Sequence, residues 1–162
     1  MSGLSAGCIC WFRQGNSDSR KYANEDNNTL IKVSGLDYIG ALIYPHYDVE
    51  KHRQGALKMM MKNTKGIAIA LENCSAIEVV DDNYRILTSM KNKNAWKVYW
   101  CRGQYFREKM VKNGKFQALA GLLQKKYDKH LLNVFLIFPS CHIVPVQTIS
   151  AAFQNRRLSC QV

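Results

Sequence analysis

The chain has 162 residues, of which 47% are hydrophobic and 22% charged, with only 3 Pro and 10 Gly and a net charge of +11. This length fits one domain, and the composition excludes a disordered, collagen-like or low-complexity protein. No apolar run reaches the roughly 18 residues of a membrane-spanning helix, and no basic segment precedes the apolar N-terminal residues as in a signal peptide, so we expect a cytoplasmic protein away from membranes.

The first half of the chain predicts one strand–helix–strand unit. Residues 13–29 are polar and predict a loop or a broken helix. The apolar run 38–44 ends at a proline and predicts a buried strand. Residues 48–64 predict a helix with Asp48 as its N-cap. One face of that helix would hold Val49, Arg53, Ala56, Leu57 and Met60.

Residues 67–71 predict a second buried strand. A strand–helix–strand unit from 38 to 71 needs a right-handed crossover and implies a parallel sheet, so the fold class is α/β. Two hairpins are predicted after it, 76–80 with 84–87 and 96–101 with 104–108. Residues 116–127 predict a helix.

Positive charge is concentrated in residues 85–129, the basic stretch, where 12 Lys or Arg residues accompany only Glu108 and Asp128. Aromatic residues are interleaved with these charges, as in nucleic-acid grooves. A solvated surface with an aromatic core behind it has the same composition, and no base-reading motif is present. We favour the solvated surface and expect no nucleic-acid partner.

The six cysteines lie at positions 8, 10, 74, 101, 141 and 160 without regular spacing. Without an export signal, this pattern favours reduced thiols. Neither C-x-x-C nor H-x-x-x-H occurs, and the lone C-x-C of Cys8 and Cys10 is a weak signal. We therefore expect no metal and no cofactor.

A G-x-S-x-G motif begins at Gly3 and ends at Gly7. In a nucleophile elbow the serine sits on a strained turn between a strand and a helix, and the glycines remove Cβ atoms that would clash. The hydroxyl is thereby exposed, and the next backbone N–H can stabilise an oxyanion. Ser5 is the candidate nucleophile, and Ala6 would supply the N–H.

A serine nucleophile needs a base and an acid that orients the base. His46 follows the predicted strand 38–44, and Glu72 follows the predicted strand 67–71, so both would lie at the carboxyl edge of a parallel sheet. Interpretations without a catalytic role stay open: His46 could be an ordinary loop histidine, and Glu72 could be an ordinary surface acid. The other histidines, His52, His130 and His142, lack such placement.

The segments GLSAGCICWF, YPHYD followed by EKHRQ, and GIAIALENCSAIEVVD resemble the peptidase E family of serine peptidases (aspartyl dipeptidases), to which cyanophycinases are related. The resemblance covers about residues 2–126. It implies a three-layer α/β sandwich with a mainly parallel sheet, like that of class I glutamine amidotransferases. It also implies a triad of Ser5, His46 and Glu72.

The resemblance implies acyl transfer on short peptides, with dipeptides beginning with Asp as substrates. The substrate carboxylate then needs a cation, for which Arg53 is a candidate because Arg binds carboxylates bidentately. An ordinary helix-surface arginine is the favoured alternative. Asp18 is either an acid beside the site or, as we favour, a loop cap.

Two departures from the family pattern stand out. Only Met1 and Ser2 precede the motif, too few to form the strand that leads into an elbow, so we expect the C-terminal half of a peptidase E-like domain with the upstream half missing. Residues 127–162 match nothing in the family. They could form an added strand pair, or, as we favour, they could be sequence that was never selected as protein. We therefore expect the chain to divide into a peptidase E-like part, residues 1–126, and an extension of unknown origin, residues 127–162.

The function expected is that of a serine-type dipeptidase. An alternative is an inactive peptidase-like fragment that acts, if at all, as a binding module through the basic stretch. A nucleic-acid binder rests on charge alone, and the oligomeric state stays open.

Overall fold

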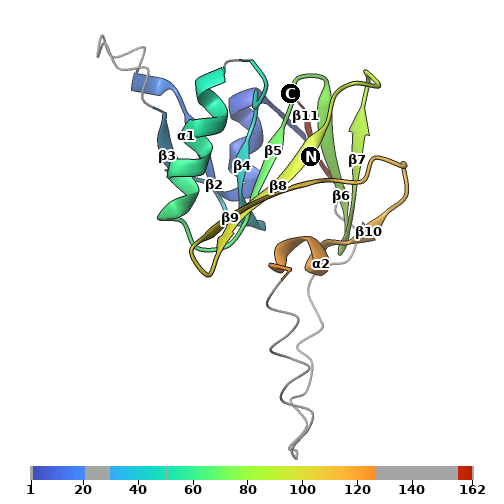
Figure 1. The fold of residues 1–162 in the computed structure, drawn as a ribbon. Coiled ribbons are helices and arrows are strands. Elements are labelled where there is room, and N and C mark those ends of the chain that lie inside the picture. Colours follow the sequence, from blue (N-terminus) through green and yellow to red (C-terminus); the bar gives the residue numbers. More distant parts are fainter. Residues whose placement is uncertain (1, 21–29, 50, 127–156, 162) are drawn as a thin grey trace, which may run out of the picture.

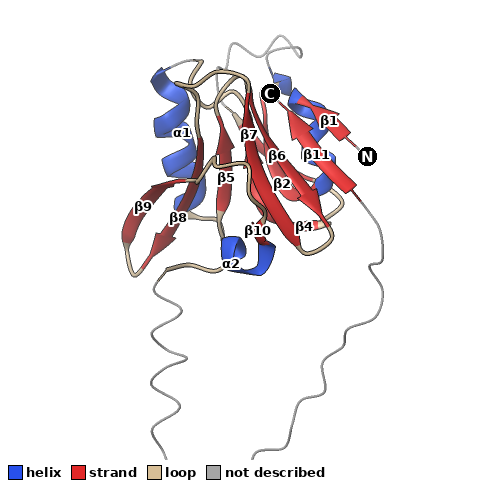
Figure 2. Ribbon diagram, turned by 90° about the vertical axis from the view of Figure 1, so that its right-hand side faces the viewer, coloured by secondary structure: helices blue, strands red, loops and turns tan. Residues whose placement is uncertain are grey.

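A computed structural model describes residues 2–20, 30–49, 51–126 and 157–161. Two β-sheets face each other, and helix α1 (Lys51–Lys62) covers the outer face of the larger sheet (Figures 1 and 2). The described part of the chain therefore has three layers, one of helix and two of sheet.

The larger sheet has the strand order β3-β2-β4-β5-β8-β9. Its strands β2, β4 and β5 run parallel, whereas β3, β8 and β9 pair antiparallel with their neighbours. In this order the strands are Ile31–Ser34, Phe12–Ser17, Ile39–Tyr44, Ala68–Leu71, Ala95–Cys101 and Gln104–Lys109.

The smaller sheet has the order β1-β11-β6-β7-β10. Its pairing is antiparallel except between β1 and β11. These strands are Ser2–Leu4, Arg157–Gln161, Ser75–Val80, Asn83–Thr88 and Gln117–Ala118. A 3-10 helix, η1 (Ser5–Trp11), follows β1, and a short helix, α2 (Leu119–Leu123), follows β10.

The predicted strand–helix–strand unit is confirmed, because β4, α1 and β5 follow one another and β4 pairs parallel with β5. Both predicted hairpins are also present, β6 with β7 and β8 with β9. The fold is α/β, as expected, but its sheets are mixed rather than mainly parallel. For β8 and β9 the reason is local, since the turn at Arg102 and Gly103 (φ 49° and 75°) reverses the chain within two residues and makes these two strands pair antiparallel.

Three expected elements differ from the structure. Residues 12–17, expected in part as loop, form β2, where Gly15 and Asn16 are buried because β2 lies between β3 and β4. Of the helix expected at 116–127, only α2 is helical among the described residues, and residue 127 lies outside them. Val49, expected on the same helix face as Arg53 and Leu57, precedes α1 and is 51% exposed.

The strand that leads into the serine motif is also present, contrary to expectation. Residues Ser2–Leu4 form β1, which pairs parallel with β11, and β11 pairs with β6. A strand from the C-terminal extension thus supplies the neighbour that β1 needs. Residues 127–156 lie outside the described residues, and the division at 126 stays a prediction.

Two apolar clusters fill the spaces between the layers, and β4 contributes to both. Ile43 belongs to the cluster between the two sheets, and its neighbour Leu42 to the cluster beneath α1. This follows from the alternation of side chains along a strand. Because both faces of β4 are covered, its sequence is continuously apolar rather than alternating.

Among the described residues, no helix has the length and apolar character needed to cross a membrane. The four cysteines that can be assessed are free thiols, as the irregular spacing predicts: Cys8, Cys10, Cys74 and Cys101.

Candidate active site

Ser5 and His46 meet although 40 residues separate them in the sequence. Ser5 Oγ lies 2.7 Å from His46 Nε2, which is hydrogen-bonding distance. Ser5 is the first residue of η1, directly after β1, and His46 lies two residues beyond the end of β4. Two elements from different sheets thus bring together a hydroxyl and the ring nitrogen that could take its proton.

The backbone at Ser5 has the strain expected of a nucleophile elbow. Ser5 has φ 51°, in the left-handed region that residues with a side chain rarely adopt, and His46 has φ 56°. Cys74 also lies in this region, with φ 63°. Such strain costs about 1–3 kcal/mol per residue and gathers at functional sites.

The two glycines of the motif are not equivalent. A Cβ atom at Gly3 would meet the backbone of Gly7 and lie 2.7 Å from the Cα atom of Cys8, whereas a Cβ at Gly7 meets nothing within 4 Å. The expected clash thus exists at position 3 and not at position 7.

The second ring nitrogen of His46 contacts an asparagine. His46 Nδ1 lies 2.8 Å from Asn73 Oδ1. Asn73 lies two residues beyond the end of β5, the strand that runs parallel to β4. The carboxyl ends of adjacent parallel strands thus place Asn73 behind His46, at the edge where the sequence analysis expects Glu72.

Glu72 is held elsewhere in this structure. Its Oε1 accepts a hydrogen bond from the Trp96 indole at 2.8 Å, and its Oε2 accepts one from the Asn94 backbone N–H at 2.9 Å. These bonds tie the end of β5 to β8. The residue that contacts His46 is the next one in the chain, and the signal that could have found it is its place at the same strand end.

Asp48 and Lys93 form an ion pair behind Asn73. Asp48 Oδ1 accepts the Asn73 backbone N–H at 2.8 Å, and Asp48 Oδ2 accepts from Lys93 Nζ. Burial raises the pKa of Asp48, but the hydrogen bonds from Lys93 and Asn73 outweigh it, so this pKa lies below its ordinary value. The bond to Asp48 raises the pKa of Lys93. Asp48, expected as a helix N-cap, thus supports the loop that carries Asn73.

Arg53 and Asp18, the two candidates for recognition of a charged substrate, lie together. Arg53 Nη2 is 3.8 Å from Asp18 Oδ2, and Arg53 is buried whereas Asp18 is partly exposed. The Tyr44 hydroxyl donates to the Arg53 carbonyl at 3.0 Å. Arg53 is therefore a buried arginine that faces a carboxylate, not an arginine on the helix surface.

The remaining candidates are Ala6 and the other three histidines. Ala6 is exposed and directly follows Ser5 in η1. His52 lies on the exposed side of α1. His130 and His142 fall outside the described residues. In the part of the chain that is described, no three His, Cys, Asp or Glu side chains are grouped so as to hold a metal ion.

A cavity of about 430 Å³ is lined in part by the chain neighbours of two residues of the candidate site. Leu4, which precedes Ser5, and Cys74, which follows Asn73, both line it. Its other described lining residues come from β6 and the end of β7: Ser75, Ala76, Leu87, Thr88 and Ser89. None of these described side chains is charged, so they suit a neutral group.

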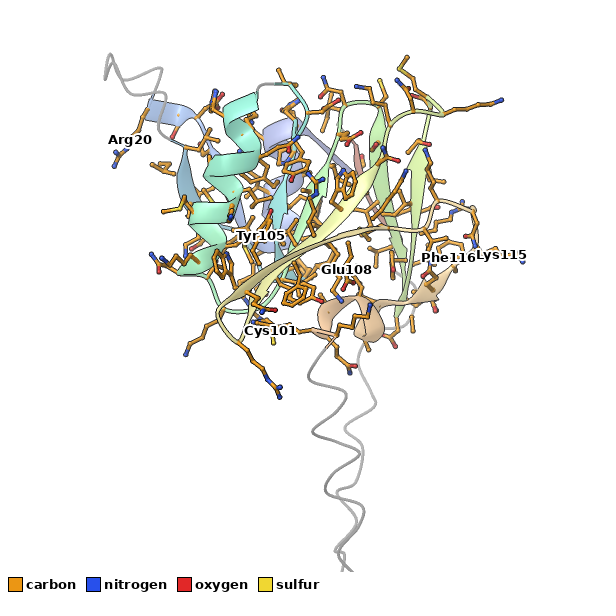
Figure 3. All side chains as sticks on the ribbon, in the orientation of Figure 1. Arg20, Cys101, Tyr105, Glu108, Lys115 and Phe116 are labelled. Atoms are coloured by element: carbon orange, nitrogen blue, oxygen red, sulfur yellow. The ribbon has the colours of Figure 1, made fainter. Side chains whose placement is uncertain are left out.

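The aromatic residues of the basic stretch contribute to the core. Tyr99 is fully buried and stacks on Phe106 with ring centroids 5.2 Å apart. Burial and the hydrogen bond to Glu108 raise the pKa of Tyr99. Tyr105, on β9, lies near α1 (Figure 3), where Lys58 is 5.4 Å from its ring centroid. Tyr99 and Phe106 therefore pack inside the molecule, and the absence of a nucleic-acid partner stays a prediction.

Comparison with known proteins identifies the family. The chain is 28% identical over 100 residues to a Bacillus subtilis (strain 168) protein described as the uncharacterized peptidase YgaJ, an alignment that covers 60% of this chain and 40% of that protein. The chain thus spans well under two thirds of the length of this relative. No solved structure matches this chain significantly. The model of peptidase family S51 matches residues 1–87, more than half of the chain and the part that contains Ser5, His46 and Asn73, and we conclude that the protein belongs to this family.

Proposed function

We propose that the protein is a serine-type peptidase that cleaves short peptides through an acyl-enzyme on Ser5. The observation that carries the proposal is the 2.7 Å contact between Ser5 Oγ and His46 Nε2. A serine hydroxyl becomes a nucleophile when a neighbouring base takes its proton. Membership of peptidase family S51 supports the same reaction class.

In the proposed reaction, Ser5 Oγ bonds to the carbonyl carbon of the peptide while its proton moves to His46 Nε2. The C–N bond then breaks, and the leaving amine takes that proton from His46. Water attacks the acyl-Ser5 ester, His46 accepts a proton from the water and returns it to Ser5 Oγ, and the acid is released. The Ala6 N–H is the proposed oxyanion donor, because it directly follows the nucleophile.

The third place in the triad is assigned to Glu72 by the resemblance to peptidase E. The same resemblance implies an arrangement like that of class I glutamine amidotransferases, which the parallel strands β2, β4 and β5 support. The contact of Asn73 with His46 points to a different residue in the orienting role.

Dipeptides that begin with Asp are the proposed substrates, again by resemblance. Arg53 is the candidate for the substrate carboxylate, and its guanidinium already faces the carboxylate of Asp18. A substrate that begins with Asp would take the place of Asp18. The neutral lining of the cavity beside Ser5 suits the part of the peptide that carries no charge.

Covalent labelling with a fluorophosphonate tests the proposal. The folded wild-type chain is expected to take up the probe at Ser5, located by mass spectrometry of the digest, and both Ser5→Ala and His46→Ala are expected to lose labelling. Ser19→Ala is the matched control, because Ser19 is an exposed serine outside the site. Wild-type protein that has not been treated with the probe would then be tested for hydrolysis of dipeptides.

Absence of labelling in a chain that circular dichroism shows to be folded would contradict the proposal. The alternative would then be an inactive peptidase-like protein that binds partners through the basic stretch. Salt-dependent retention of nucleic acid by such a protein would identify nucleic acid as the partner.

A further inference from the structure

Asn73 contacts His46 through the ring nitrogen that Ser5 does not use. Asn73 Oδ1 lies 2.8 Å from His46 Nδ1, while Ser5 Oγ lies 2.7 Å from Nε2. An amide oxygen accepts hydrogen bonds and cannot donate them, so this contact requires a proton on Nδ1. A neutral ring with that proton has its lone pair on Nε2, where the Ser5 hydroxyl donates.

Asn73 is itself held from two sides. Its backbone N–H donates to Asp48, which is paired with Lys93. The turn that contains Asn73 is closed by the Ser75 N–H, which donates to the Glu72 carbonyl at 3.1 Å. Asn73 is therefore anchored both within its own turn and against the loop that carries His46.

We infer that Asn73 orients His46 and selects its Nδ1–H tautomer, with the Asp48–Lys93 ion pair holding Asn73 in place. The inference deepens the proposed function and rests on it, because the tautomer matters only if His46 acts as a base toward Ser5. Asparagine occupies the equivalent place in Cys-His-Asn proteases. Asn73 is a positioning residue, since it acts through His46.

The neutral side-chain amide of Asn73 affects His46 differently from a carboxylate. A carboxylate fixes the tautomer and also stabilises the imidazolium, whereas an amide fixes the tautomer without adding negative charge. The charged groups around the Asn73 turn have other partners: Asp48 is paired with Lys93, and Glu72 accepts from Trp96 and Asn94. A carboxylate at position 73 would therefore be a new charge against Nδ1.

The ¹⁵N chemical shifts of the histidine ring nitrogens test the inference without any need for activity. The chain has 4 His residues, and His46→Gln identifies the signals of His46. At pH 8 the wild-type protein is expected to carry the His46 proton on Nδ1. In Asn73→Ala the population is expected to move toward the Nε2–H tautomer. A wild-type His46 with its proton on Nε2 would overturn the inference even if every variant failed to fold.

Labelling rates measured against pH give the second readout. Asn73→Ala is expected to slow fluorophosphonate labelling of Ser5 by about tenfold or more, since loss of the correct tautomer in a triad costs up to about 10⁴ in kcat. Asn73→Asp is expected to restore part of the rate and to move the acid limb of the profile up by about one pH unit or more, because a carboxylate favours the protonated ring. Asn63→Asp, the same change at an exposed position after α1, is expected to leave the limb in place.

The competing assignment to Glu72 predicts the opposite pattern. If Glu72→Gln shifts the His46 tautomer and Asn73→Ala does not, the inference about Asn73 is overturned while the proposed peptidase stands. If the wild-type chain is folded but is not labelled, the proposed function fails, and the ring-nitrogen shifts still decide whether Asn73 orients His46.

Discussion

Position 3 faces the backbone of Gly7 so closely that a Cβ atom on Gly3 would lie 2.7 Å from the Gly7 carbonyl carbon. Real Cβ atoms do not approach backbone atoms to that distance, so β1 and η1 would have to separate if position 3 carried a side chain. That separation would move Ser5, the first residue of η1, away from His46. The approach of Gly3 to Gly7 is therefore a condition for the Ser5–His46 contact.

Gly3→Ala is accordingly expected to destabilise the protein by about 1–3 kcal/mol, the usual cost of forcing an extra carbon into a packed site. It is also expected to reduce labelling of Ser5. The measurements are urea unfolding and the labelling rate. Gly7→Ala is the matched control, because a Cβ there meets no atom within 4 Å, and it is expected to change both quantities little. Equal effects at the two positions would refute the steric explanation.

The ion pair between Asp48 and Lys93 predicts a pH dependence of stability. The pKa of the Asp48 carboxyl lies below its ordinary value of 3.8 in the folded protein. Its stabilising contribution is therefore fully present above the unfolded-state pKa and is lost as the pH falls through the folded-state pKa. The difference in unfolding free energy between wild type and Asp48→Asn is expected to be largest near pH 6 and to shrink below pH 4.

Urea unfolding at pH 6, 5, 4 and 3 measures that difference. Asp82→Asn is the control, since Asp82 is an exposed carboxylate in the turn between β6 and β7. A gap between wild type and Asp48→Asn that stays constant across this range would show that protonation of Asp48 does not weaken the fold.

Arg53 gives a prediction for specificity. Arg53→Met keeps the apolar stem of the side chain and removes the guanidinium that faces Asp18. The value of kcat/KM for a dipeptide that begins with Asp is expected to fall by about tenfold or more relative to one that begins with Ala, because the substrate carboxylate loses a charge-assisted partner. Labelling of Ser5 is expected to continue.

The control for this prediction is Arg13→Met, which removes an exposed arginine paired with Asp37 at 3.0 Å. It is expected to lower kcat/KM for neither dipeptide. A parallel loss on both dipeptides in Arg53→Met would assign Arg53 to the packing beneath α1 instead of to substrate recognition.

Much of the fold could be predicted because local patterns were sufficient. The apolar run of β4, the helix at α1 and the apolar run of β5 mark a parallel unit, and the short turns between β6 and β7 and between β8 and β9 mark hairpins. β2 was harder, since Arg13, Gln14 and Asn16 make it polar. Its place between β3 and β4 comes from long-range strand pairing, which the residues of β2 alone do not predict.

The amino-acid sequence by itself determined the reacting types and their approximate places: a serine in a glycine-flanked turn and a histidine after a buried strand, with the carboxylate of Glu72 expected after the next strand. Tertiary structure decided which atoms meet. Glu72 and Asn73 are adjacent in the chain and leave the same strand end, so no local pattern separates them. Trp96 and Asn94 bind Glu72 whereas His46 meets Asn73, because the direction of each side chain depends on strands that are distant in the sequence.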